Sequence, residues 1–346
     1  MNTVIQRLQM EDAGRNEFYM KRDDLLPFSI GGNKVRIAEA FFADMECEGA
    51  DTMLIYGSRH SNLCRVLSDL CASRGKKCVM ICSHEQGEAD VPTNNTKLIE
   101  WTGTKMIHCG KTEIAETVER AMEEIRSEGG VPYYIYGNKF GKGREGVAAR
   151  AYAEAYQEIL RQEQELGTAF DYIFCPSGTG ATQTGLICGH LMAGDTKKIV
   201  GIMISSREKE RAYQVIEEGA LAYFKEQNAV CEAEAAGKEC VSGLQNDICK
   251  SAVMGLQSRL NGEICLLDQY RQEGYGKYDA RIEACIRSQY LKNGIPLDPI
   301  YTAKAFWGMT EYVREAGIQD SKILFLHTGG TPLFFDYLEG GAPDVR

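Results

Sequence analysis

Short apolar runs alternate along this chain with longer stretches in which apolar residues recur at helical spacing. We predict strands at residues 52–56, 78–82, 105–108, 133–135, 172–175, 198–204 and 322–326. We predict helices between them, at residues 34–47, 61–73, 94–101, 113–127, 146–165, 181–193 and 303–316. Such alternation is typical of α/β proteins with parallel sheets, and near-continuous apolar strands such as 199–204 indicate burial on both faces.

The segment 205–249 differs from this pattern, because it is charged, rich in Ala and Glu, and contains no strand signal. We predict helices there that border or cover a sheet, and a solvated helical surface would explain the same composition. The length of 346 residues suggests two domains. No Pro- or Gly-rich linker separates two halves, so the chain can cross between domains more than once.

The charge balance narrows the class of partner. The chain has 39 Lys and Arg against 49 Asp and Glu, a formal net charge of −10, so neither nucleic acid nor an anionic membrane surface is expected. It has no apolar run of about 18 residues and no signal-peptide pattern at its start. We therefore expect a cytoplasmic protein whose 13 cysteines stay reduced. No metal is expected, since the histidines lack zinc-ligand spacing to a cysteine pair.

Three loops that follow strands or open helices carry candidate chemistry, because open α/β sheets bind ligands at the carboxyl ends of their strands. The loop 176–185 has the sequence Pro-Ser-Gly-Thr-Gly-Ala-Thr-Gln-Thr-Gly and opens a helix. Its glycines let the backbone approach closely, and the helix N-terminus favours an anion. It predicts a phosphate site without being a P-loop or a dinucleotide fingerprint. A plain glycine-rich turn is the alternative.

The other two loops lie earlier in the chain. Lys34 follows Gly31, Gly32 and Asn33 at a predicted helix start, where burial and the helix dipole disfavour its charged form. A neutral lysine amine can form a Schiff base, although a surface lysine is the default reading. The loop 57–62 ends in Ser61 and Asn62, which suit either a helix N-cap or a carboxylate site. Together the three loops suggest pyridoxal 5'-phosphate (PLP) and an amino-acid substrate.

Six motifs occur in a fixed order: Gly31-Gly32-Asn33-Lys34-Val35-Arg36, Ser61-Asn62, Ser177-Gly178-Thr179-Gly180, Tyr275-Gly276, Asp298-Pro299-Ile300-Tyr301-Thr302 and His327-Thr328-Gly329-Gly330. In this order they resemble the 1-aminocyclopropane-1-carboxylate (ACC) deaminase / D-cysteine desulfhydrase family, from about residue 18 to residue 337. The resemblance implies an α/β fold of two open, mainly parallel twisted sheets with helices on both faces, the tryptophan synthase β-like PLP fold type II. It places the cofactor in a cleft between a large PLP-binding domain (1–50 and 161–346) and a small domain (51–160), and it implies a homodimer.

The resemblance also implies roles for individual residues. Lys34 would hold PLP covalently, and Ser61, Tyr275 and Tyr301 would be the other catalytic residues. Further cofactor contacts would come from Asn62 at the phenolic oxygen, from Ser177, Gly178, Thr179, Gly180, Ala181 and Thr182 at the phosphate, from Thr302 at the pyridine nitrogen and from Thr328 beside the ring. The substrate would contact Arg59, Ser61, Asn62, Leu63, Tyr275, Tyr301 and Thr328.

Two positions favour the desulfhydrase branch of this family. The deaminases typically have Glu where this chain has Thr302 and Leu where it has Thr328. A glutamate would keep the pyridine protonated and strongly electron-withdrawing, and a neutral threonine would not. Elimination of a good β-leaving group needs less carbanion stabilisation than opening a cyclopropane ring. We therefore predict a carbon–sulfur lyase that converts D-cysteine to pyruvate, sulfide and ammonia by α,β-elimination, with Lys34 or Ser61 as the base.

Several alternatives stay open. Arg59 and Leu63 depart from the family pattern, and Arg59 would suit an acidic β-substituent such as the sulfonate of cysteate. It is equally compatible with a structural arginine. Another β-substituted alanine, ACC itself or a β-replacement reaction would use the same machinery. A non-catalytic protein that binds a phosphorylated metabolite is the alternative from a different class.

Overall fold

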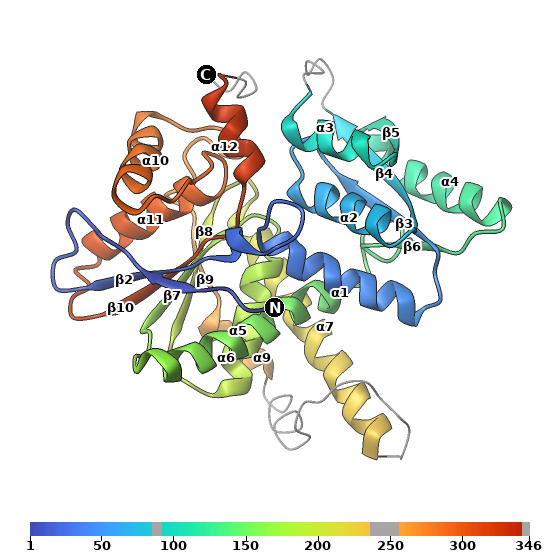
Figure 1. Cartoon of the computed structure of the whole chain (residues 1–346). Coiled ribbons are helices and arrows are strands. Elements are labelled where there is room, and N and C mark those ends of the chain that lie inside the picture. Colours follow the sequence, from blue (N-terminus) through green and yellow to red (C-terminus); the bar gives the residue numbers. More distant parts are fainter. Residues whose placement is uncertain (85–91, 236–255, 341–346) are drawn as a thin grey trace. The chain divides into compact units, whose positions relative to one another are not determined.

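The computed structural model describes residues 1–84, 92–235 and 256–340 (Figure 1). Backbone contacts divide the chain into two compact units, and each unit has its own sheet. The first unit comprises Met1, Asp24–Arg144 and the segment from Gly329 onward. The second unit comprises Asn2–Asp23 and Glu145–Thr328. The chain therefore passes between the units more than once.

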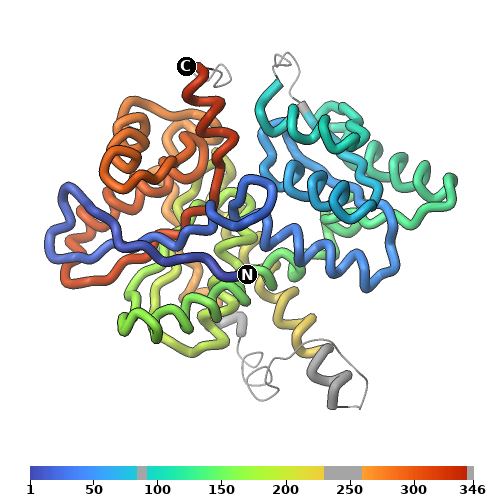
Figure 2. Tube along the Cα trace, viewed as in Figure 1, coloured from blue at the N-terminus to red at the C-terminus, as the bar shows by residue number. Residues whose placement is uncertain are grey.

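The sheet of the second unit has the strand order β1-β2-β10-β7-β8-β9. Its strands are Ile5–Arg7 (β1), Glu17–Lys21 (β2), Tyr172–Ser177 (β7), Lys198–Met203 (β8), Cys265–Leu267 (β9) and Lys322–Leu326 (β10). All neighbours are parallel except β1, which runs antiparallel to β2. Figure 2 shows the blue strands from the start of the chain beside the red strand β10, so the two ends of this unit's chain complete one sheet.

This unit also contains α-helices. They are Glu145–Leu166 (α5), Ala181–Ala193 (α6), Lys209–Ala235 (α7), Leu256–Glu263 (α9), Ala280–Asn293 (α10) and Thr302–Glu315 (α11). Both α6 and α11 pack against β7 and β8, and Figure 1 shows them on opposite sides of the sheet. Two glycines bring α6 close to α5: a Cβ on Gly185 would lie 2.3 Å from the Ala149 carbonyl oxygen, and one on Gly189 would lie 2.4 Å from Tyr156 Cβ.

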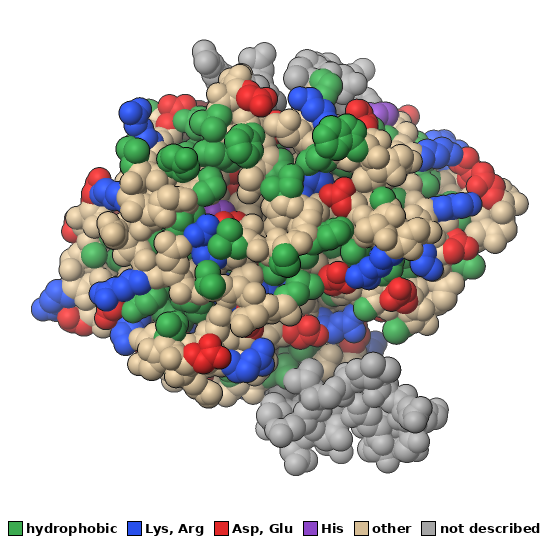
Figure 3. Space-filling model, in the orientation of Figure 1, with side chains coloured by type: hydrophobic (Ala, Val, Ile, Leu, Met, Phe, Trp, Pro, Cys, Tyr) green, Lys and Arg blue, Asp and Glu red, His purple; other side chains and the backbone are tan. Residues whose placement is uncertain are grey.

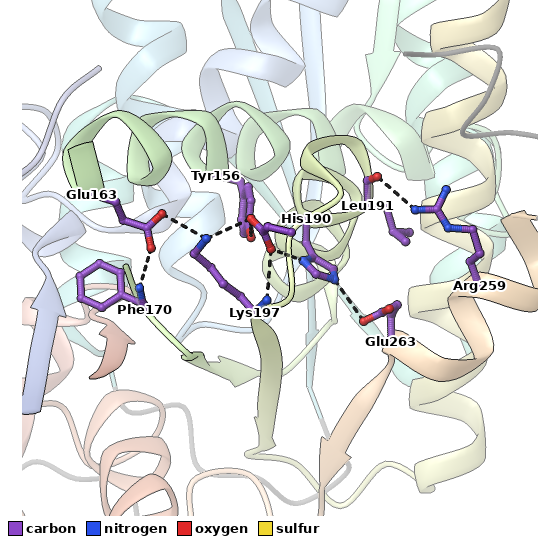
Figure 4. A network of polar contacts seen from close by, with 9 residues as sticks. Tyr156, Glu163, Phe170, His190, Leu191, Lys197, Arg259 and Glu263 are labelled. Atoms are coloured by element: carbon purple, nitrogen blue, oxygen red, sulfur yellow. Dashed lines mark hydrogen bonds and ion pairs between the residues drawn. The ribbon is translucent and has the colours of Figure 1, made fainter. Parts of the chain in front are cut away.

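A polar network fixes the end of α6 to the start of β8 and to α5 (Figure 4). The ammonium of Lys197 lies 3.1 Å from a Glu163 oxygen and 3.0 Å from Asp195 Oδ2. Tyr156 donates to Asp195 at 2.6 Å, and His190 Nδ1 lies 2.7 Å from Asp195 Oδ1. Burial alone would raise the pKa of Asp195, but these hydrogen bonds hold it well below its usual range.

The sheet of the first unit has the order β5-β4-β3-β6 and is parallel throughout. Its strands are Thr52–Gly57 (β3), Lys77–His84 (β4), Lys105–Gly110 (β5) and Pro132–Tyr134 (β6). Its helices are Asn33–Cys47 (α1), Asn62–Ser73 (α2), Asn94–Trp101 (α3), Ile114–Ser127 (α4) and Thr331–Leu338 (α12), with 3-10 helices at Asp23–Leu25 (η1) and Lys111–Glu113 (η2). α2 and α4 pack on the sheet, α1 packs on α2, and α12 packs on α3.

The predicted strands and helices are present, with ends that differ by one or two residues, and the fold class is confirmed. Sequence patterns missed the strands β1, β2 and β9 and the helices α9, α10 and α12, because each is short or lacks a clear apolar period. A helix in the segment 205–249 is confirmed by α7, and residues 236–249 lie outside the described part of the chain.

The two units are bounded differently from the predicted domains. The prediction places residues 24–50 and 329–346 in the large domain and residues 145–160 in the small one. Backbone contacts group them the other way, because α1 packs on α2, α12 packs on α3, and α5 packs on α6 and α7. Helix packing across long sequence separations, which composition does not reveal, sets these bounds.

Charges of both signs are interspersed on the face drawn in Figure 3, and Lys and Arg do not gather into one large patch there. None of the described helices combines the length and the apolar character needed to cross a membrane.

Candidate active site

The predicted phosphate loop, from Ser177 to Thr182, lies at the carboxyl end of β7 and the N-terminus of α6. Gly180 is the N-cap with a φ of 93°, a left-handed value that favours glycine, and no side chain caps the helix. A Cβ on Gly180 would lie 3.0 Å from Ile216 Cγ1, so a side chain there would crowd the loop. Because Gly180 offers no side-chain cap, the N-terminus of α6 and the loop before it fit an anion such as phosphate.

The two predicted tyrosines lie together in the same unit. The hydroxyl oxygens of Tyr275 and Tyr301 are 2.8 Å apart, and the rings meet edge to face with centroids 5.8 Å apart. Tyr301 is the residue before α11, so the start of that helix positions it. Thr328 is the second residue after β10 and is buried.

Thr302 opens α11 and is fully buried. Its hydroxyl donates to Asp298 Oδ2 at 2.7 Å and accepts from the Asp298 N–H at 2.8 Å. Asp298 also accepts from the backbone N–H of Tyr301 at 2.7 Å. Burial raises the pKa of the Asp298 carboxyl. This ring of bonds shapes the turn before α11, and it leaves Thr302 an uncharged residue whose one O–H is donated to a neighbour.

Lys304 is a functional candidate that sequence reasoning missed. It is fully buried, and its ammonium donates to the backbone carbonyls of Gly274 at 2.6 Å and Ile204 at 3.4 Å. Burial lowers its pKa to about 8. Because Gly274 precedes Tyr275, Lys304 fixes the loop that carries this tyrosine. The sequence signal that could have found it is a lysine among small and apolar residues in the predicted helix 303–316.

Lys34 occupies the first turn of α1 in the first unit. Gly31 and Gly32 before it have φ of 67° and 98°, and a Cβ on Gly329 would lie 2.5 Å from Gly32 Cα, so the His-Thr-Gly-Gly motif reaches the lysine loop through its glycine. Burial lowers the pKa of Lys34 to about 8, although part of the side chain remains exposed. Within the described residues its amine has no hydrogen bond or ion pair, unlike that of Lys304.

Ser61 is the N-cap of α2, and its hydroxyl accepts from the Cys64 N–H at 3.1 Å. The capping interpretation is therefore confirmed, and it leaves the Ser61 O–H as a donor. A Cβ on Gly57 would lie 2.9 Å from Ser61 Oγ, so this glycine makes room for the serine. Asn62 and Leu63 follow in the first turn and are partly exposed, whereas Arg59 is buried.

Asn95, in the first turn of α3, is a second residue that sequence reasoning missed. It is fully buried, and its Nδ2 donates to the His60 carbonyl at 3.0 Å and to Asn62 Oδ1 at 3.1 Å. Its Oδ1 has no hydrogen-bond partner in the part of the chain that the structure describes. The sequence predicts the helix 94–101, but a contact between Asn95 and Asn62 depends on the fold and has no local signal.

A cavity of about 360 Å³ in the first unit lies away from these residues. Thr52, Lys77 and Lys105 line it, and they begin β3, β4 and β5. It therefore opens at the amino ends of the strands, whereas Ser61 and Asn62 follow the carboxyl end of β3. This cavity is therefore not the predicted site.

Three observations fit PLP. The phosphate loop leads into the N-terminus of α6 through a glycine N-cap, Lys34 presents an amine without a partner among the described residues, and Asn95, which has an unpaired polar atom, contacts Asn62. The predicted residues are divided between the units. Lys34, Arg59, Ser61, Asn62 and Leu63 belong to the first unit; the loop 177–182, Tyr275, Tyr301, Thr302 and Thr328 belong to the second.

The fold is a two-sheet α/β architecture, and the predicted residues fit a phosphorylated aldehyde. The family model "Pyridoxal-phosphate dependent enzyme" matches residues 2–329, and the chain belongs to this family. A D-cysteine desulfhydrase of Klebsiella pneumoniae is 28% identical over 95% of this chain and 91% of its own. An ACC deaminase of Burkholderia cenocepacia is 30% identical over 96% of this chain and 92% of its own.

Solved structures agree with this assignment. A crystal structure of an ACC deaminase homologue has a TM-score of 0.78 and 27% identity, and covers 98% of this chain and 93% of its own. O-ureido-L-serine synthase, with a TM-score of 0.64, 17% identity and coverage of 99% of this chain and 93% of its own, shares the fold. The predicted PLP cofactor and the predicted class, a PLP-dependent lyase, are thereby confirmed.

Proposed function

We propose that this enzyme converts D-cysteine and water to pyruvate, hydrogen sulfide and ammonia by α,β-elimination. The relatives include both a D-cysteine desulfhydrase and an ACC deaminase at similar identity, so their names do not select the substrate. The choice depends on the residues of this chain.

Thr302 carries the proposal. It is neutral, fully buried, and donates its O–H to Asp298. A residue of this kind does not stabilise a protonated pyridine as a carboxylate would. Bound PLP supplies the electron sink that makes the α-proton of an amino acid acidic. A weaker sink suffices where a β-substituent such as sulfide leaves readily.

The other residues act on the substrate and cofactor. Lys34 holds the cofactor, and its amine, with a pKa near 8, is suited to remove the α-proton near neutral pH. The Ser61 hydroxyl already accepts from Cys64, so its O–H donates to the substrate carboxylate. The N–H groups of the loop 177–182 bind the cofactor phosphate. Tyr275 and Tyr301 flank the substrate, and Asn62 donates to the phenolic oxygen.

A substrate panel tests the proposal. The cofactor-loaded enzyme is given D-cysteine, L-cysteine, cysteate and ACC, and pyruvate, 2-oxobutanoate and sulfide are measured, with Lys34→Ala as the inactive control. We expect pyruvate and sulfide in equal amounts from D-cysteine. Loaded enzyme that forms no pyruvate from D-cysteine would refute the assignment. Pyruvate from cysteate would instead indicate that Arg59 binds an acidic β-substituent. Formation of 2-oxobutanoate from ACC would indicate a deaminase.

We also propose a cytoplasmic homodimer, as the family resemblance implies. Light scattering on the eluting protein checks this, with twice the 38.5 kDa chain mass as the expected result.

A further inference from the structure

The amide of Asn62 has a fixed direction. Its Oδ1 lies 3.1 Å from Asn95 Nδ2, and the same Asn95 nitrogen lies 3.0 Å from the carbonyl oxygen of His60. A backbone carbonyl can only accept, so the group of Asn95 that faces His60 must be its NH₂. The atom of Asn62 that meets this NH₂ must then be its oxygen. The direction of both amides follows from one carbonyl.

The start of α3 is held firmly enough for this relay. Thr93 and Thr96 form a capping box at the N-terminus of α3. Thr93 Oγ1 donates to the Arg59 carbonyl at 2.9 Å, so the helix start also binds the loop just before His60. The backbone N–H of Asn94 is held by Asp336 of α12 at 3.1 Å. Asn95 is fully buried and cannot exchange its partners for water.

We propose that Asn95 is a positioning residue that turns the NH₂ group of Asn62 toward the phenolic oxygen of PLP. With Asn62 Oδ1 occupied by Asn95, the two N–H donors of Asn62 point away from α3. This inference rests on the role proposed for Asn62. Without Asn95 the Asn62 amide can flip, and its Oδ1 would then face the phenolic oxygen of PLP.

The consequence is electrostatic and measurable without a substrate. A donor at the phenolic oxygen stabilises its anionic form and lowers the pH at which the Lys34-linked cofactor loses its proton. Loss of one hydrogen bond to a charged acceptor corresponds to a shift of about one pH unit. We therefore expect Asn95→Ala to raise the apparent pKa of the visible absorption band by about one unit and to weaken PLP binding about tenfold.

The experiment titrates this band in wild type, Asn95→Ala, Asn95→Asp, Asn62→Ala and the double variant Asn62→Ala/Asn95→Ala. Asn95→Asp keeps the side-chain volume but offers only acceptors, so it should turn the Asn62 NH₂ toward α3 and away from the phenolic oxygen. This variant tests the proposal if Asn95→Ala does not fold. The structural control is Thr93→Val, which removes both the bond to the Arg59 carbonyl and the cap on the Thr96 N–H but keeps the amides of Asn95 and Asn62.

We expect the single Asn95 variants to raise the pKa, the double variant to match Asn62→Ala, and Thr93→Val to match wild type. An unshifted pKa in folded Asn95 variants would overturn the proposal. So would an Asn95→Ala substitution that shifts the pKa equally in the wild type and in Asn62→Ala. A shift in Thr93→Val of the same size would reduce Asn95 to a structural role. Failure on D-cysteine alone would refute the proposed substrate and leave these titrations valid.

Discussion

Replacing Lys34 by methionine should stabilise the cofactor-free protein at neutral pH, although it abolishes activity. The amine of Lys34 has no hydrogen-bond or ion-pair partner within the described residues, and burial lowers its pKa from an ordinary value of 10.5 to about 8. Folding therefore transfers an uncompensated cation out of water, and methionine of similar length removes that cost.

The magnitude follows from the pKa difference. A shift of about 2.5 pH units corresponds to about 3 kcal/mol, and this is an upper value because part of the side chain remains exposed. Below pH 8 both the folded and the unfolded chain hold the proton, and the full penalty applies. Between pH 8 and 10.5 only the unfolded chain keeps it, so the free energy of unfolding of the wild type rises with pH. Above pH 10.5 the penalty is absent.

Urea denaturation of the cofactor-free proteins at pH 7, 8, 9 and 10 measures the difference. We expect the free energy of unfolding of Lys34→Met to exceed that of the wild type by about 1–3 kcal/mol at pH 7. This difference should close as the pH approaches 10. The matched control, Lys97→Met on the exposed face of α3, should change stability by less than about 0.5 kcal/mol at every pH. A pH-independent gap, or a destabilised Lys34→Met, would refute the assignment of an unpaired buried amine.

Three further variants test other parts of the account. Lys304→Met should lower kcat at least tenfold by releasing the Tyr275 loop, with a small change in melting temperature, since relief of the buried charge offsets the lost hydrogen bonds; unchanged kcat would contradict this. Gly180→Val should weaken PLP binding at least tenfold in equilibrium dialysis and lower the free energy of unfolding by about 1–3 kcal/mol. The reason is that φ of Gly180 is 93° and its Cβ would lie 3.0 Å from Ile216 Cγ1. Lys197→Met leaves the buried Glu163 without its cation and should cost about 3–5 kcal/mol in chemical denaturation; a loss below 1 kcal/mol would count against the network.

Much of the fold was predictable because parallel strands buried on both faces leave continuous apolar runs. β8 and β10 are examples, and both were predicted almost to the residue. The strands β1 and β2 could not be found in this way. They are short, and they belong to the sheet only because β10, some 300 residues later, pairs with β2. Long-range pairing of this kind leaves no local signal.

The candidate site shows the same division. The positions of the loop 177–182 and of Lys34 at helix starts were predictable because glycines precede both helices in the sequence. Lys304 and Asn95 were not, since each acts on a predicted residue through space: Lys304 through the carbonyl of Gly274, and Asn95 through the oxygen of Asn62. Supporting residues of this kind become visible only when the fold brings helix and loop together.

Peptide mapping after borohydride reduction of the PLP-loaded enzyme shows whether the Lys34 amine carries the cofactor. Lys304 is the alternative attachment site, because burial also lowers its pKa to about 8. Its ammonium, however, already donates hydrogen bonds to two backbone carbonyls. We predict the reduced cofactor mass on the peptide that contains Lys34 and none in Lys34→Ala. The mass on the Lys304 peptide, or on no lysine at all, would contradict the account.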